Sequence, residues 1–346
     1  MVGLALVTGF SIIGASANAS VNTVVDQRLR ADFVISTAVS KPFTPDVAAR
    51  VSHVPGVGAV MQDRVGAVLV DGRQTSIAAV DAEVLAQTIA LDYVAGSAAG
   101  LTNSGMLVDR PTAEARKWAV GDAAHVLLPN GKRINLTIGG IYEPDRIIGS
   151  LVIALSAYEA AGGPALDQAV FIDLDRSADA GAVRAALDSV VAEYPVVTLK
   201  DRSEFKAQMS GQVDQLILLL DALLGLSVLI AGLGIVNTLA LAVIERTREI
   251  GLLRAIGMSR RQLRKMIVLE AVIMSLFGAL LGIVLGVVFG IGLTHALAGQ
   301  GIGVLSVPVW RLVLFLGVAA VIGLVAALWP ARRASRLRIL DAIANG

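Results

Sequence analysis

Two long, predominantly apolar stretches, residues 216–244 and 266–297, flank one short and densely charged segment. Each is longer than the ~20 apolar residues that a helix needs to cross the hydrocarbon core of a bilayer. A third apolar stretch, residues 309–329, follows and ends in tryptophan, a residue enriched at membrane interfaces. Hydrophobic residues make up 55% of the sequence, which excludes an ordinary soluble domain. The chain is therefore predicted to be an integral membrane protein.

Residues 2–19 form a further uncharged stretch that is just long enough to span a bilayer. A secretory signal peptide is the alternative, because ASANA at residues 15–19 resembles a cleavage site, although the positively charged start of a signal peptide is missing. We favour a first transmembrane helix over residues 1–20, and we expect the chain to begin late or to be part of a longer protein. Four spans place both termini in the cytoplasm.

The charged segment sets the expected orientation, because cytoplasmic loops collect Lys and Arg close to membrane spans. Residues 20–210 hold 17 basic against 22 acidic residues, whereas the rest of the chain holds 12 against 6. The positive-inside rule accounts for this excess, so nucleic-acid binding is not expected. The basic residues that we expect in the cytoplasm are Arg246, Arg248, Arg254, Arg260, Arg261, Arg264 and Lys265 in the loop 245–265, and Arg332, Arg333, Arg336 and Arg338 near the C-terminus.

The charged segment is also predicted to contain a turn between two helices. Gly257 suits the left-handed position that closes a helix, and Ser259 with Gln262 has the spacing of a capping box for the next helix. Apart from Gly211, the first helix is expected to run without a break from Asp201 to Ile256. Its last turns carry an apolar stripe formed by Ile250, Leu253 and Ile256/Gly257, beside the charged Arg248 and Glu249. From the residues alone, docking of a soluble partner and a simple positive-inside anchor both remain open.

Residues 21–205 have a different pattern, with short β-branched runs bounded by Gly, Pro, Asn and Asp. Asn130-Gly131 and Asp71-Gly72 each predict a tight turn between two strands. Helical patterns are interleaved at residues 44–53, 111–118 and 177–193, and the last has an apolar stripe at Val183, Ala186, Leu187 and Val190. The segment is predicted to be one extracytoplasmic α+β domain.

No catalytic or metal site is predicted. His53 and His125 are isolated in the sequence, the HExxH, GxSxG and GxxxxGK[ST] patterns are missing, and the count of cysteines is 0. Asp173 and Asp175 are better explained as turn residues than as a paired-carboxylate site, and Asp145-Arg146 as a solvated loop that is a candidate contact. We therefore expect a protein that is not an enzyme and binds no cofactor.

Two features of the spans predict contacts within the membrane. Asp214 and Asp221 lie on one helix face, so both are expected to point at protein or water; for Asp221, a neighbouring chain at the outer interface and an ion path are the alternatives. In the third span, glycines at every fourth position form a smooth stripe that another helix can approach closely. The sequence leaves open whether the second span, the fourth span or a second chain of the same kind is the partner. The stripe consists of Gly278, Gly282, Gly286 and Gly290.

The motifs ERTREIGLLRAIGMSRRQL and PARRASRLRILDAI closely resemble the FtsX-like permease domain of ABC transporters of the MacB and lipoprotein-releasing type, most clearly over residues 213–346. The resemblance implies that the segment 245–257 is a coupling helix that contacts a cytoplasmic ABC ATPase, which binds the ATP because this chain lacks a phosphate-binding loop. It also implies a MacB-like periplasmic core domain and a homodimer or a second permease half. The coupling residues would be Glu245, Arg246, Arg248, Glu249, Ile250, Gly251, Leu253 and Gly257.

The predicted fold is thus four transmembrane helices with an extracytoplasmic α+β domain between the first and second. Its parts are span 1 (1–20), the outer domain (21–205), and the stalk and permease domain (206–346), which holds spans 216–244, 266–297 and 309–329 and the coupling loop 245–265. Two functions remain. The first is a permease of the cell membrane (plasma or inner membrane) that transmits ATPase-driven motion for efflux, lipoprotein handling or envelope regulation, with an extracytoplasmic protein as a further expected partner. The second is an anchored extracytoplasmic binding or sensing module without energy coupling.

Overall fold

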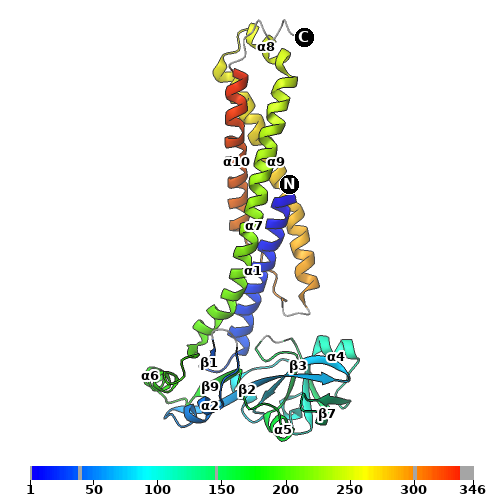
Figure 1. Ribbon diagram of the computed structural model, residues 1–346, viewed down its shortest axis with the longest axis vertical. Helices are drawn as coiled ribbons and strands as arrows, with labels where there is room; N and C mark the ends of the chain where they lie inside the picture. The colour runs from blue at the N-terminus through cyan, green and yellow to red at the C-terminus, as the bar shows by residue number, and fades with distance from the viewer. Residues whose placement is uncertain (1, 38–40, 145–146, 299–301, 336–346) are drawn as a thin grey trace. The chain divides into compact units, whose positions relative to one another are not determined.

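The computed structural model describes residues 2–37, 41–144, 147–298 and 302–335 (Figure 1). By contacts the chain divides into two compact units. The helical unit is built from Met1–Ala19, Gln212–Ala298 and Ile302–Gly346, and the sheet unit from Ser20–Gly211. Two helices, α1 (Val2–Arg28) and α7 (Arg202–Glu245), contribute residues to both units.

Within the helical unit, α7, α8 (Thr247–Ala255), α9 (Arg260–Ala296) and α10 (Val309–Ser335) follow one another along the chain (Figure 1). Among the described residues, four helical segments are long and apolar enough to cross a membrane: Val2–Arg28, Val228–Glu245, Arg260–Ala296 and Val309–Ser335. This confirms the predicted number of spans. The sheet unit lies in the sequence between the first two of them, as expected.

The prediction of one unbroken helix from Asp201 to Ile256 is wrong at Arg246. The backbone leaves helical geometry there (φ −92°, ψ 18°), and α8 begins at the next residue. The Thr247 hydroxyl donates to the carbonyl oxygens of Val243 and Ile244 at 3.0 and 2.7 Å, and so occupies acceptors at the end of α7. The break turns α8 so that Ile250 packs into the interior of the helical unit.

Ten strands form one mixed sheet in the described part of the sheet unit, in the order β10-β1-β9-β2-β3-β8-β5-β7-β4, with β6 paired to β2 and β7. Five helices and a 3₁₀ turn lie between the strands, and α4 and α5 directly follow β5 and β8. The strands are β1 (Phe33–Thr37), β2 (Val57–Val70), β3 (Arg73–Val80), β4 (Tyr93–Gly96), β5 (Gly105–Asp109), β6 (Ala123–Leu127), β7 (Arg133–Tyr142), β8 (Leu151–Ala154), β9 (Ala169–Leu174) and β10 (Val197–Asp201). The helical segments are α2 (Asp46–Val51), α3 (Leu85–Thr88), η1 (Ala98–Gly100), α4 (Arg110–Arg116), α5 (Leu155–Ala160) and α6 (Ala180–Val191).

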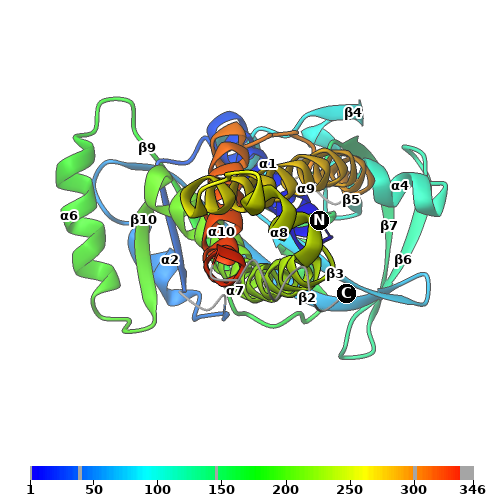
Figure 2. The ribbon, with the colours of Figure 1, turned by 90° about the horizontal axis from the view of Figure 1, so that it is seen from above.

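Both predicted hairpins are confirmed. Asp71 and Gly72 connect β2 to β3 with positive φ values of 49° and 77°, the backbone that a type I′ turn requires. Gly131, at φ 82°, turns the chain between β6 and β7. The third predicted helix is α6, and its stripe residues Val183 and Leu187 are buried. They pack with α2 against β1, β9 and β10. Figure 2 shows α2, α6, β9 and β10 together at one end of the sheet.

The end of α1 and the beginning of α7 pack on the other face of the sheet. Val21 and Val25 of α1, together with Leu29 just after it, share a core with residues of β1, β2, β3 and β9. Phe205 and Met209 of α7 pack against this core. The rings of Phe205 and Phe171 meet edge to face, with centroids 6.4 Å apart. Within the sheet unit, both helices are therefore held by a common apolar core.

Candidate functional site

The turn between α7 and α9 is the first candidate site, because it holds the predicted coupling helix. Ile250 of α8 is 5% exposed and packs with Leu263 and Ile267 of α9 and with Ala331 and Ala334 of α10. This cluster fixes which side of the nine-residue helix faces inward. The opposite side faces solvent.

The end of α8 follows the sequence prediction. Gly257 adopts a positive φ of 109°, and the amide of Met258 donates to the carbonyl of Leu253 at 3.1 Å, a bond that closes the helix. Ser259 then caps α9, and the predicted capping box with Gln262 is confirmed: each side chain bonds the backbone of the other residue. α8 is thus held between two defined backbone turns.

The structure places the predicted coupling residues on two different sides of α8. Glu245, Arg246, Arg248, Glu249 and Gly257 are exposed, and Arg246 pairs with Glu270 of α9 at 3.2 Å. Ile250 and Gly251 are buried, and Leu253 is half-buried, so Ile250 and Gly251 offer no surface to a partner in this structure.

The exposed large apolar residues here are instead Leu252 of α8 (62% exposed) and Ile256 at its C-cap (75% exposed). They follow Arg248 at spacings of four and eight, so the three form one row along the helix. We call Arg248, Leu252 and Ile256, together with Glu249, the α8 outer face. The sequence analysis missed Leu252, although its i+4 spacing from Arg248 was a usable signal. It could not show which of two apolar stripes faces inward.

The glycine stripe of α9 lies against α1. A Cβ atom added to Gly286 would lie 2.5 Å from the carbonyl oxygen of Ala5 and 2.5 Å from Cβ of Thr8. One at Gly290 would lie 3.0 Å from Cβ of Ile12 and 3.2 Å from the carbonyl oxygen of Gly9. Gly282, Gly286 and Gly290 are buried. The first span, which the sequence analysis did not consider as a partner, thus makes the close approach at Gly286 and Gly290.

The predictions for the two aspartates of α7, Asp214 and Asp221, have different outcomes. Oδ1 of Asp214 accepts a hydrogen bond from the Asn18 side-chain amide of α1 at 2.7 Å, so this carboxylate points at protein, as expected. The side chain of Asp221 lies outside the described residues, as do Asp145 and Arg146. The basic residues Arg336 and Arg338 lie outside them as well.

Ion pairs fix the start of α7 to the sheet unit. Lys206 binds Asp26 of α1 at 2.7 Å, and Arg202 lies 3.3 Å from Asp32 and donates from Nε to the carbonyl oxygen of Ala31 at 2.8 Å. Arg184 of α6 binds Glu204 at 2.8 Å. These pairs surround the first turns of α7 and join it to α1, to α6 and to Asp32, which directly precedes β1.

A buried charge cluster lies in the middle of the sheet, and the sequence analysis missed it. Arg64 of β2 is 4% exposed, and its guanidinium binds Asp167 and Glu159 at 2.7 Å each. Gln62 donates to the second oxygen of Asp167 at 2.9 Å. The available signal was the polar run Gln62-Asp63-Arg64 inside a strand pattern that is otherwise apolar.

Asp63 has no such partner. It is 4% exposed, and its Oδ1 accepts no hydrogen bond from any described residue. Its neighbours across the sheet, Val80 and Ala169, belong to the core that holds α1 and α7, so the carboxyl lies on that face. Burial raises the pKa of Asp63 to about 7, and the charge of Asp167 acts in the same direction.

The remaining polar candidates of the sheet unit have structural partners. Nδ1 of His53 lies 2.7 Å from the carbonyl oxygen of Ala49, and Nδ1 of His125 lies 2.8 Å from the side-chain oxygen of Asn135. Among the described residues, no group of three or more His, Cys, Asp or Glu side chains is arranged to hold a metal ion. Asp175 joins a turn through its backbone, which accepts from Ala178 at 2.9 Å.

Four apolar helices with a sheet unit inserted after the first define a multi-pass helical membrane protein. Residues 222–339 match the family model of the FtsX-like permease C-terminal domain. A macrolide export ATP-binding/permease protein MacB of Rhodopirellula baltica is 33% identical over 151 residues, and one of Bdellovibrio bacteriovorus is 30% identical over 210 residues. Residues 222–339 therefore resemble the FtsX-like permease C-terminal domain, and parts of the chain are similar to MacB proteins.

These relatives are much longer than the matched region. The two alignments cover 43% and 58% of this chain but only 21% and 31% of the relatives. Among solved structures, the periplasmic region of MacB from Actinobacillus actinomycetemcomitans is similar to 51% of this chain and 91% of its own, at 9% identity and a TM-score of 0.40.

Proposed function

We propose that this chain is the permease part of an ABC transporter, and that the α8 outer face binds the transporter's nucleotide-binding domain. One observation carries the proposal. α8 buries one side in the helical unit and presents an apolar row with flanking charges on the other. Exposed Leu252 and Ile256 beside Arg248 and Glu249 form the mixed apolar and charged surface that protein partners bind.

The nucleotide-binding domain is expected either on a separate subunit or on the same polypeptide. The sequence lacks GxxxxGK[ST], so residues 1–346 do not supply the phosphate-binding loop. The relatives are named as ATP-binding/permease proteins, in which one protein carries both parts. Two copies of this chain, or this chain and a second permease half, would then act with two nucleotide-binding domains.

We further propose that α7 transmits motion from α8 to the sheet unit. α7 is one helix from Arg202 to Glu245, joined to α8 through the single residue Arg246. Its first turns are held in the sheet unit by the Lys206–Asp26 ion pair and by the packing of Phe205. A helix resists bending, so displacement at one end is carried to the other rather than absorbed.

The proposed location is the inner membrane, with the sheet unit outside and the turn 245–265 inside. Because the chain has no cysteine, single substitutions Lys132→Cys in the β6–β7 hairpin and Arg261→Cys in α9 allow labelling in intact cells. We expect a membrane-impermeant maleimide to label Lys132→Cys in intact cells and Arg261→Cys only after the membrane is permeabilised, as the positive-inside rule requires. Labelling of Arg261→Cys in intact cells would show that the chain has the opposite orientation.

Charge reversal on α8 tests the docking proposal. A photo-crosslinker at Leu252 in native membranes should capture a peptide from a polypeptide that contains GxxxxGK[ST]. Arg248→Glu should weaken this cross-link and ATP-dependent activity strongly, because an interfacial charge that loses its partner costs about 2–5 kcal/mol. Membrane insertion should be unchanged, since Arg248 is exposed and makes no ion pair with a described residue.

Lys265→Glu is the matched control, because Lys265 is also an exposed cation of the same loop but lies on α9. Reversal there should leave the cross-link intact. Equal losses of the cross-link in both variants would mean that the overall charge of the loop, and not the α8 outer face, determines binding. A cross-link that never captures a nucleotide-binding domain would favour the alternative function, an anchored extracytoplasmic binding module.

A further inference from the structure

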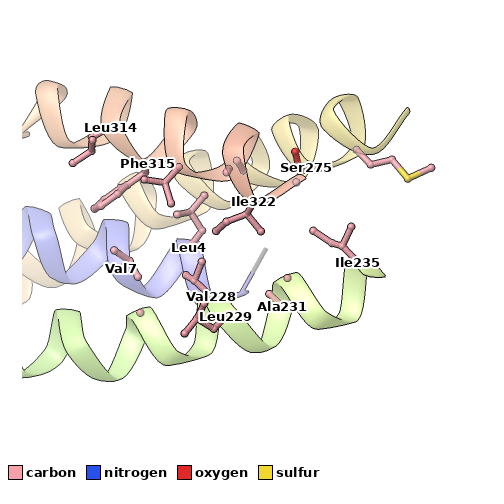
Figure 3. A pocket seen from close by; sticks show the side chains of 18 residues that line it. Leu4, Val7, Val228, Leu229, Ala231, Ile235, Ser275, Leu314, Phe315 and Ile322 are labelled. Carbon is pink, nitrogen blue, oxygen red and sulfur yellow. The ribbon is translucent and has the colours of Figure 1, made fainter. Parts of the chain in front are cut away.

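The four membrane helices leave a cavity of about 620 Å³ between them. Its wall takes residues from α1, α7, α9 and α10, all within the helical unit. Figure 3 shows Ile322 of α10 and Ile235 of α7 extending toward the same space, near Leu4 of α1. The cavity is therefore a feature of one chain, at the level of its candidate spans.

The wall is apolar. Of the described residues that line it, only Ser275 carries a hydroxyl, amide or charged side chain, and this hydroxyl already donates to the carbonyl oxygen of Val272 at 2.9 Å. A buried water needs two to four polar partners, so water is a poor occupant. An unfilled space is also unfavourable, because the atoms around it lose their dispersion contacts.

Small residues keep the space open. Gly225 and Gly278 line the cavity, and a Cβ atom added to Gly225 would have no neighbour within 4 Å. At the edges the same helices touch: Gly232 of α7 meets Ile322 of α10, and Gly323 of α10 meets Ser275 of α9. The helices thus contact one another around the cavity but do not fill it.

We propose that this cavity binds one aliphatic chain of a bilayer phospholipid. The surrounding hydrocarbon supplies such chains, and an aliphatic chain needs no hydrogen-bond partner. A transmembrane helix of a second copy fits less well, because a helix with side chains is ~10 Å wide and 620 Å³ would hold only about one and a half of its turns. The site is independent of the proposed docking of α8 and goes beyond the proposed function.

The test uses the full chain in phosphatidylcholine nanodiscs that contain a small fraction of phosphatidylcholine with a diazirine on its acyl chain. After illumination, mass spectrometry maps the cross-links. We expect labelling of peptides that contain residues 274–279 or 314–322, measured relative to the exposed surface around Leu285 and Val288, which any surrounding lipid reaches.

Filling the cavity should remove this labelling. Gly225→Leu places a side chain in the open space, whereas Gly234→Leu on the same helix lies outside the cavity wall and also has no neighbour within 4 Å. We expect the relative labelling of 274–279 and 314–322 to be lost in Gly225→Leu and retained in Gly234→Leu. Ala319→Leu, with Gly317→Leu as its control, repeats the comparison from α10.

Three outcomes would overturn the proposal. Wild-type labelling that avoids both peptides would mean that no acyl chain enters. Equal labelling in Gly225→Leu and Gly234→Leu, or in Ala319→Leu and Gly317→Leu, would mean that the label comes from lipid around the protein. Cross-links at these peptides to a second copy of the chain would mean that a neighbouring protomer occupies the space.

Discussion

Gly286→Leu is expected to separate α1 from α9 and to cause the largest loss of stability of any single substitution in the membrane helices. Its Cβ atom alone would lie 2.5 Å from both the Ala5 carbonyl oxygen and the Thr8 Cβ. The first of these is a backbone atom, so the helix as a whole must move. Overpacking typically costs ~1–3 kcal/mol, and a leucine beside a backbone should lie at or above the upper end. Helix propensity favours leucine over glycine by only about 1 kcal/mol, so packing decides the sign.

Gly292→Leu makes the same chemical change six residues further along α9. A Cβ atom there would meet nothing within 4 Å, so this variant should keep the wild-type melting midpoint in detergent or raise it slightly. The midpoint of Gly286→Leu should fall by several degrees, with loss of monodisperse protein in size-exclusion chromatography. If the two variants melt together, the contact between α1 and the glycine stripe does not hold the helical unit together.

Local sequence signals predicted the elements of this structure well. The Ser259–Gln262 capping box, the Gly257 helix end and the two Gly-containing hairpin turns each depend on a few neighbouring residues, and all are present as expected. The four spans follow from length and apolar composition alone. Such features are determined by interactions within a few neighbouring residues, or within the length of one span.

Features that depend on tertiary contacts were not predictable in the same way. α8 carries apolar residues on two sides, and Ile250 faces inward only because Leu263 and Ala331 lie where the break at Arg246 directs it. The glycine stripe shows that some helix approaches closely, but any span could supply the partner. Assigning it to α1 requires the position of Thr8 and Ile12 beside Gly286 and Gly290, which no local pattern contains.

The burial of Asp63 also depends on tertiary contacts and was not predictable from the local sequence. Its neighbours Gln62 and Arg64 suggest an exposed polar segment, yet β2 is covered on both faces there. Arg64 is committed to Asp167 and Glu159, and Lys206 to Asp26, so these cations have partners other than Asp63. The nearby Asp81 carboxyl accepts a hydrogen bond from the backbone N–H of Gln62 at 3.0 Å, and burial raises the pKa of Asp81 as well. On the face that holds α1 and α7, the folded state is thus most stable when the Asp63 carboxyl is protonated.

The sheet unit is therefore expected to lose stability as the pH rises from 5 to 8. Because the folded-state pKa of Asp63 is raised from 3.8 to about 7, the folded state binds more protons than the unfolded state between these values. Stability falls with rising pH across that window and reaches its lowest level above pH 7. At about 1.4 kcal/mol per pH unit, the full effect between pH 5 and 8 is on the order of 2–3 kcal/mol. Asp63→Asn should remove most of this dependence.

Trp118 allows the measurement in the full chain, because the other two of the three tryptophans, Trp310 and Trp329, lie in the helical unit. In a Trp310→Phe, Trp329→Phe background, its fluorescence reports unfolding of the sheet unit. The native chain should unfold at a lower denaturant concentration at pH 8 than at pH 5, and the Asp63→Asn chain should show little difference. Acidic groups with lowered pKa, such as Glu193 and Glu204, act in the opposite direction and below this window. An equal pH dependence in both chains would mean that the Asp63 carboxyl is already ionised in the folded protein at pH 5. Another group would then have to stabilise this buried charge.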